Sequence, residues 1–193
     1  QGHIGFALTE DWRNGNFAVE IHKLRVHPSI QNLLVGGTIG NVQVDGRGSL
    51  MQGELSQWNG RIALENVKGA GWSGAGIDVR STFVPGTFKL DGKLARLEVD
   101  RGWPLYPQLQ QVFPPVESPW TWKDIIARVD VHATGGVIQQ ITARDPIQTW
   151  RLRGDWVRDG RMSGMLSVGA ARAKSFALNG EKGLLAVEEV AAR

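Results

Sequence analysis

Residues 127–168 read ARVDVHATGGVIQQITARDPIQTWRLRGDWVRDGRMSGMLSV, and apolar and polar side chains alternate through much of this stretch. Ala127 and Val129 fall on one face of an extended chain, and Arg128 and Asp130 fall on the other. The same two-residue period recurs in three segments, 77–83, 150–156 and 162–168. This pattern is typical of an antiparallel sheet with one buried face and one wet face.

Turn chemistry accompanies the alternation. Asn-Gly and Asp-Gly tolerate the positive φ angles of a two-residue hairpin turn. These pairs occur six times, at 14–15, 45–46, 59–60, 91–92, 159–160 and 179–180. We expect each pair to be a hairpin turn. A tryptophan precedes three of them, which predicts stacked hairpins with aromatic residues near their turns.

The alternation breaks phase once near the N-terminus. Val19 and Ile21 fall on one face of a strand, whereas Leu24 falls on the other. An extra residue in one strand restores the phase, so we expect a β-bulge or a strand bend near His22.

One segment interrupts the strands. Residues 103–123 read WPLYPQLQQVFPPVESPWTWK and hold five of the eight prolines. Pro107 fits the first turn of a short helix, which Pro114 and Pro115 would end. We therefore expect a meander over 1–102, a proline- and aromatic-rich connection over 103–123, a second meander over 124–180 and a tail over 181–193. Propensity favours a helix in that tail.

The predicted fold is a single all-β domain, because 193 residues lie within the usual size of one domain. It is a predominantly antiparallel, multi-hairpin sheet that is curved or folded over on itself, with one short helix. A flat single sheet would leave its apolar face exposed, which soluble monomers rarely tolerate.

Composition excludes several classes of function. The absence of cysteine excludes disulfide scaffolds, thiolate zinc sites and cysteine catalysis. A net charge of +3 falls short of the clustered basic footprint of a nucleic-acid binder, so we expect no nucleic-acid partner. The chain opens at Gln1, which suggests that a signal peptide, a membrane anchor or an expression tag was removed upstream.

Catalytic and cofactor motifs are weak. Residues 69–74, GAGWSG, match the dinucleotide pattern GxGxxG, but the β-like segment 77–83 follows where a helix is needed. A flexible glycine turn is the better interpretation. His22 and His27 would share a face only across a bulge, and solvent-facing histidines are favoured over a metal pair. We expect no enzyme activity, no catalytic residues, no cofactor and no metal.

The aromatic connection is the best candidate for a ligand site, because such loops often cover or flank binding sites. We predict that seven of its residues form the rim or lid of an apolar groove: Trp103, Leu105, Tyr106, Leu109, Phe113, Trp120 and Trp122. The alternative is that these side chains belong to the core. Trp58, Trp150 and Trp156 are interpreted as core and turn-packing residues. Arg151, Arg153 and Arg158 could meet lipid headgroups or phosphates, but a solvated polar face is favoured because acidic residues are interleaved with them.

The glycine-punctuated strands LVGGTIGNVQVDGRGSLMQGELSQWNGRIALENV and FKLDGKLARLEVD, followed by the segment from WKDIIARVDVHATGG onward, resemble AsmA-like periplasmic proteins of Gram-negative bacteria. They also resemble an uncharacterised alphaproteobacterial family and, more distantly, type II secretion protein N. The resemblance implies a periplasmic envelope protein, often tethered to the inner membrane, with an apolar concave face. Larger members are associated with phospholipid movement between membranes. This chain is short, and the resemblance offers no catalytic residues to carry over.

Three functions follow as hypotheses. The first is a non-enzymatic envelope protein that binds a lipid or another acyl-chain ligand in an apolar groove. The second is a scaffold or assembly module of an envelope or secretion complex, which would bind a protein partner by strand addition. The third is a carbohydrate-binding sandwich with exposed tryptophans. We expect a periplasmic location, with an inner-membrane anchor in the removed N-terminal segment.

Overall fold

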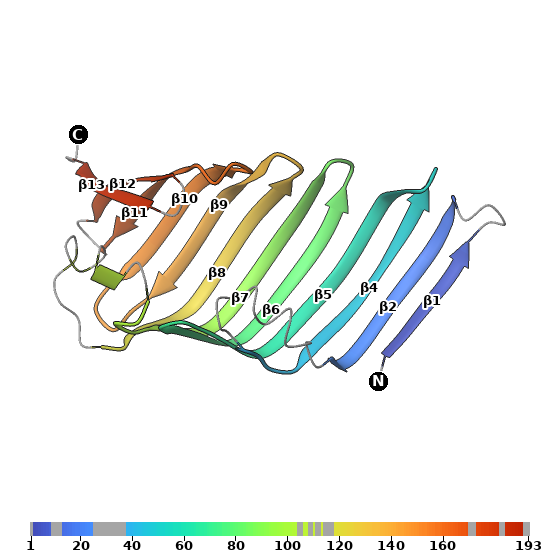
Figure 1. Ribbon diagram of the computed structural model, residues 1–193, viewed down its shortest axis with the longest axis horizontal. Helices are drawn as coiled ribbons and strands as arrows, with labels where there is room; N and C mark the ends of the chain where they lie inside the picture. The colour runs from blue at the N-terminus through green and yellow to red at the C-terminus, as the bar shows by residue number, and fades with distance from the viewer. Residues whose placement is uncertain are drawn as a thin grey trace.

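The computed structural model describes residues 2–8, 13–24, 38–103, 106–107, 110, 113, 118–169, 173–181 and 184–190. Their strands form one antiparallel sheet that follows chain order from β1 to β13, except that β3 lies off this order and pairs with β5 (Figure 1). The described strands are β1 (Gly2–Leu8), β2 (Gly15–Leu24), β3 (Thr38–Ile39), β4 (Val42–Met51), β5 (Glu54–Gly69), β6 (Trp72–Val84), β7 (Thr87–Val99), β8 (Trp120–His132), β9 (Gly135–Arg144), β10 (Thr149–Val157), β11 (Met162–Val168), β12 (Lys174–Glu181) and β13 (Leu184–Val190). The predicted all-β, antiparallel, multi-hairpin fold is confirmed.

The cross-strand register sorts the side chains onto two faces. Ile62 of β5 lies opposite Val79 of β6, and Leu90 of β7 lies opposite Val129 of β8. Residues directly opposite share a face, so one face is apolar from β2 to β12. We call it the apolar face; its larger members include Phe17, Val19, Ile21, Val44, Trp58, Ile62, Leu64, Ile77, Val79, Phe83, Phe88, Leu90, Leu94, Leu97, Trp122, Ile125, Val129, Ile141, Trp150, Leu152, Trp156, Leu166, Phe176 and Leu178. The opposite face, which we call the polar face, carries most of the charged residues of the described strands.

The predicted phase break is confirmed. The register between β2 and β4 shifts between Ile21 and Leu24, which places the irregularity at His22 and Lys23. The pairing of the two strands resumes at Leu24, which lies opposite Val42.

Most of the Asn-Gly and Asp-Gly predictions are wrong. Asp159 and Gly160 lie in the turn between β10 and β11, as predicted, with Gly160 at a φ of 90°. Gly15 lies at the start of β2. The other four pairs lie inside strands, at 45–46, 59–60, 91–92 and 179–180. In these pairs the polar residue and the glycine fall on opposite faces, so the pair continues the alternation instead of ending a strand.

The hairpins turn at other residues. Gln52 and Gly53 connect β4 to β5 with φ angles of 56° and 82°, the double left-handed geometry expected of an Asn-Gly turn. The glycine turn predicted at 69–74 is confirmed, because Gly71 has a φ of 71° and a strand follows it at once. In the turn between β6 and β7, Gly86 follows Pro85 and has a φ of 83°.

The tail differs from the sequence prediction in its secondary structure, and the connection differs in where it ends. Residues 184–190 form β13 rather than a helix, because pairing with β12 overrides the local preference. The connection ends at Pro119, since β8 begins at Trp120. Tyr106, Pro107 and Gln110 are helical, in agreement with the predicted short helix.

The sheet curls toward its apolar face at the C-terminal end. The ring of Phe113 lies 6.1 Å from that of Trp120 in β8 and 4.9 Å from that of Phe176 in β12, between centroids. In a flat sheet, four strand spacings of about 4.8 Å would separate β8 from β12, too far for one phenyl ring to contact both. The apolar face is therefore concave here, with Phe113 inside the curve.

Candidate functional site

The buried core lies within this curve. It contains Val99, Ile125, Val168 and six aromatic side chains, which we call the aromatic core: Tyr106, Phe113, Trp120, Trp122, Trp150 and Phe176. Phe113 meets Trp150 edge-on at 4.7 Å between centroids, and Trp120 stacks on Trp122 at 4.8 Å. Edge-to-face and offset-stacked rings at these distances stabilise a core beyond the area they bury.

A pocket of about 400 Å³ opens beside the aromatic core. Its wall consists of apolar side chains and four tryptophans, from β6 to β11 and the connection. We call it the aromatic pocket, and its residues are Trp72, Leu97, Val99, Trp103, Trp122, Ile125, Ile141, Ala143, Trp150, Leu152 and Leu166. Its volume falls within the range of small-ligand pockets.

The polar atom of one wall residue is occupied. The Nε1 of Trp150 donates a hydrogen bond to the Oδ2 of Asp145 at 2.6 Å. Asp145 also accepts from the backbone N–H groups of Ile147 and Gln148, each at 2.7 Å, so it closes the turn between β9 and β10. The indole of Trp150 therefore offers a ligand its apolar ring and no free donor.

The indole Nε1 of Trp120 is different. Its side chain is 2% exposed, and this nitrogen makes no hydrogen bond to any residue that the structure describes. A buried donor without a partner costs about 1–3 kcal/mol. Apolar packing therefore holds Trp120 in the core.

The predicted site residues divide into two groups. Trp103 and Trp122 line the aromatic pocket. Tyr106, Phe113 and Trp120 lie in the core behind it, each nearly inaccessible to solvent. Leu105 and Leu109 lie outside the described residues. The described part of the connection therefore packs against one end of the apolar face and contributes to the core there. That its residues contact a ligand stays a prediction.

Sequence reasoning missed most of the pocket wall. Trp72 follows a glycine turn with no alternating segment before it, while Ile141 and Ala143 come from a strand with few aromatic residues. The strand register brings them together: Trp72 lies opposite Val99, Ile141 lies opposite Leu152, and Ala143 lies opposite Trp150. The prediction that Trp150 is a core residue is confirmed, and its side chain also lines the aromatic pocket.

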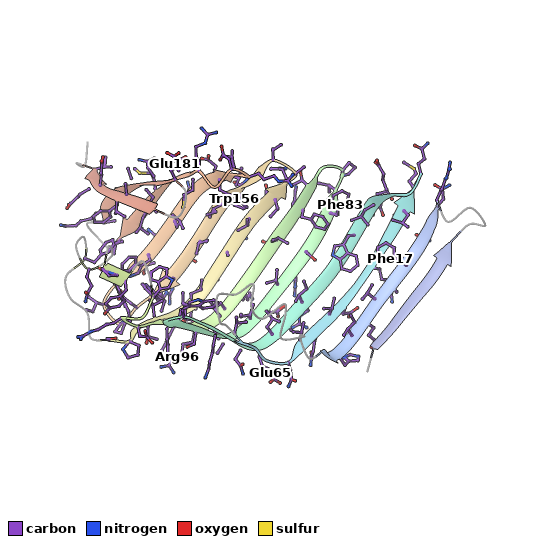
Figure 2. The ribbon with its side chains drawn as sticks, viewed as in Figure 1. Phe17, Glu65, Phe83, Arg96, Trp156 and Glu181 are labelled. Carbon is purple, nitrogen blue, oxygen red and sulfur yellow. The ribbon has the colours of Figure 1, made fainter. Side chains whose placement is uncertain are left out.

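A second hollow, of about 940 Å³, lies over β2, β4, β5 and β6. Phe17, Trp58 and Phe83 are among its lining residues. Figure 2 shows Phe83 near the upper ends of the central strands and Arg96 at their lower ends, where the aromatic pocket lies. Half-buried aliphatic residues of the apolar face, such as Val79 and Leu90, lie between the two hollows.

Glycines make room for the aromatic rings on this face. A Cβ atom on Gly60 would lie 2.7 Å from Cε2 of Trp58, and one on Gly48 would lie 2.7 Å from Cε1 of Phe17. The rings therefore lie flat over the backbone instead of standing upright. Phe17 and Trp58 in turn stack at 5.9 Å between centroids, and the Trp58 Nε1 donates to the Ser81 hydroxyl at 2.7 Å.

Some charges of the polar face form exposed pairs. The guanidinium of Arg61 donates two hydrogen bonds to Asp78, at 2.8 and 2.6 Å, and these lower the pKa of the Asp78 carboxyl. The same contact raises the pKa of Arg61. At the turn between β10 and β11, the backbone N–H of Arg161 lowers the pKa of Asp159. These are surface interactions of modest energy.

Within the described ranges, no three His, Cys, Asp or Glu side chains gather closely enough to hold a metal ion. None of the helical residues that the structure describes belongs to a helix long and apolar enough to cross a membrane.

Comparisons with known proteins provide no relative for this chain. No protein-family model, no curated protein and no solved structure was found to match it.

Proposed function

We propose that this protein is a non-enzymatic cell-envelope protein that binds a lipid, or another acyl-chain ligand, on its apolar face. The observation that carries the proposal is the aromatic pocket, a cavity of about 400 Å³ whose lining residues are all apolar or tryptophan. The pocket opens on a face that stays apolar across the neighbouring strands.

An acyl chain suits such a wall better than a polar ligand does. Each methylene that leaves water gains about 0.8 kcal/mol, and it needs no hydrogen-bond partner. A sugar would need polar side chains beside the tryptophans to pair with its hydroxyls, because unpaired polar groups lose free energy on burial. The wall residues that the structure describes offer none, and the Nε1 of Trp150 donates its hydrogen bond to Asp145, within the protein.

The state of the apolar face also supports the proposal. Phe17, Val19 and Ile21 of β2 are only half-buried, as are Ile62 and Val79 farther along the sheet. Among the described strands, extensive contacts join hydrogen-bonded neighbours alone, so these strands provide no second layer over the face. Apolar area of this kind marks a binding surface in a soluble protein.

Location and tethering rest on the resemblance to AsmA-like proteins alone. We propose a periplasmic protein that is tethered to the inner membrane.

A scaffold function is the second candidate, and the sheet edges favour it. In the described part of the chain, β1 pairs only with β2, and β13 pairs only with β12. Each leaves one side of its backbone available for strand addition from an envelope or secretion protein.

Native mass spectrometry of gently purified protein, followed by solvent extraction, tests the proposal. We expect a stoichiometric phospholipid or fatty acid. A clean apo mass, under conditions that preserve a known lipid complex, would instead favour the scaffold function.

A further inference from the structure

Three cationic side chains gather on the polar face over β8, β9 and β10. Lys123 of β8 lies directly opposite Arg144 of β9. Arg151 of β10 lies opposite Thr142, two residues before Arg144, so it is the diagonal neighbour of Arg144. All three side chains are exposed. Like charges placed opposite one another destabilise a sheet, so this arrangement calls for an anion from outside.

The protein does not supply that anion. In the described part of the chain, none of these three cations forms an ion pair, whereas Arg61, Arg128 and Lys174 pair with Asp78, Asp91 and Glu189.

The acidic residues nearest in sequence or register do not neutralise the group. Glu98 is held by Arg96 and by the Ser73 hydroxyl, and Asp145 is occupied by its own turn and Trp150. Asp124, which follows Lys123 at a φ of 52°, is exposed and makes no ion pair in the described structure.

Two exposed isoleucines flank the cations. Ile126 lies in the same cross-strand row as Thr142 and Arg151, and it is 49% exposed. Ile147 lies in the turn between β9 and β10, three residues after Arg144, and it is 82% exposed. These five residues, Lys123, Ile126, Arg144, Ile147 and Arg151, make up what we call the basic patch.

We propose that the basic patch docks the protein on the surface of an anionic lipid bilayer. A bilayer offers an array of phosphates to cations on neighbouring strands, and its interface accepts exposed apolar side chains. A free phosphate or a nucleic acid would satisfy the cations and leave the isoleucines in water. Because the basic patch lies on the polar face, behind the aromatic pocket, this docking does not depend on the proposed lipid binding.

Vesicle co-sedimentation tests the docking. We expect the protein to bind vesicles of phosphatidylcholine with about 30% phosphatidylglycerol and not to bind vesicles of pure phosphatidylcholine. Binding should weaken as the salt concentration rises. Each cation near an anionic surface strengthens binding by roughly fivefold. The triple variant Lys123→Gln/Arg144→Gln/Arg151→Gln should therefore bind about a hundredfold more weakly.

The matched control is Arg61→Gln/Arg128→Gln/Lys174→Gln, which removes the same net charge from ion-paired positions. It should retain most of the binding, and Ile147→Ser alone should weaken binding without loss of the fold. The proposal is overturned if both triple variants lose binding equally, if pure phosphatidylcholine binds as well, or if a short oligonucleotide competes at the same affinity as the vesicles. Capture of a fatty acid by the basic-patch triple variant should be unchanged. This measurement distinguishes a failure of the membrane-docking proposal from a failure of the proposed lipid binding.

Discussion

The indole of Trp58 lies flat against Gly60, two residues farther along the same strand, and it extends over Gly46 of the neighbouring β4. Any larger residue at either position would force the ring away from the sheet. The glycines of this chain are thus explained in part by aromatic packing on the apolar face, and not by turns alone.

Alanine at Gly60 should destabilise the protein. The added Cβ meets Trp58 at 2.7 Å and a backbone oxygen of Asp45 at 3.0 Å. We expect Gly60→Ala to lower the free energy of unfolding by about 1–3 kcal/mol, the usual cost of overpacking. Denaturant unfolding followed by tryptophan fluorescence measures the loss.

Gly92→Ala is the matched control, because Gly92 follows Asp91 within β7 as Gly60 follows Asn59 within β5. Its nearest neighbour would be Val79 Cγ2 at 3.7 Å, an ordinary contact. We expect no loss, since alanine also restricts the unfolded chain. Equal destabilisation of the two variants would refute the explanation of the glycines by ring packing.

Trp120 should prove essential for stability. Its ring is 2% exposed and contacts Phe113, Trp122 and Trp150. We expect Trp120→Ala to cost about 3–5 kcal/mol of unfolding free energy. Trp120→Phe should cost far less, because it keeps an aromatic ring and removes the unpaired indole donor.

Trp103 should behave in the opposite way. It is half-buried in the wall of the aromatic pocket. Trp103→Ala should weaken capture of an acyl chain while the melting temperature falls by no more than a few degrees. A large loss of stability with unchanged capture would assign Trp103 to the core as well.

The Arg61–Asp78 pair predicts a pH effect of known sign. The hydrogen bonds from Arg61 hold the pKa of Asp78 below its usual 3.8. Their contribution to stability is therefore present above the ordinary pKa of an aspartate, and it disappears as pH falls through the lowered value. In Arg61→Gln, NMR titration should show the pKa of Asp78 rising toward 3.8, because the hydrogen bonds that lower it most are removed.

Arg80→Gln provides the comparison for that titration. Arg80 acts on Asp78 through charge alone, and more weakly than Arg61 does. We expect its removal to raise the pKa of Asp78 by less. If both variants shift the titration equally, the hydrogen bonds of Arg61 are not the dominant cause.

The sequence predicted the faces of the sheet better than its turns. Alternation identified the apolar sides of β6, β8, β10 and β11, because each strand reports its own period. The turn prediction failed at 45–46 and 59–60, because both glycines make room for the ring of Trp58. For Gly46 this contact is made across strands, so the local sequence does not reveal it.

The candidate site was predictable only in part, for a similar reason. The aromatic connection is visible in the sequence, and Trp103 and Trp122 do reach the pocket. Which of its rings would be buried depends on the curl that brings Phe176 of β12 to Phe113. Trp72 and Ile141 join the wall through strand register, which no local pattern encodes.

The most direct test of the central claim is a titration with a brominated fatty acid that quenches tryptophan fluorescence. The four pocket indoles should be quenched saturably in the wild-type protein. Ala143→Phe should abolish this quenching by filling the pocket, whereas Ala75→Phe, at an exposed position opposite Arg96 on the polar face, should leave it unchanged. Absence of saturable quenching in the wild-type protein, or equal quenching in Ala143→Phe, would contradict acyl-chain binding in the aromatic pocket.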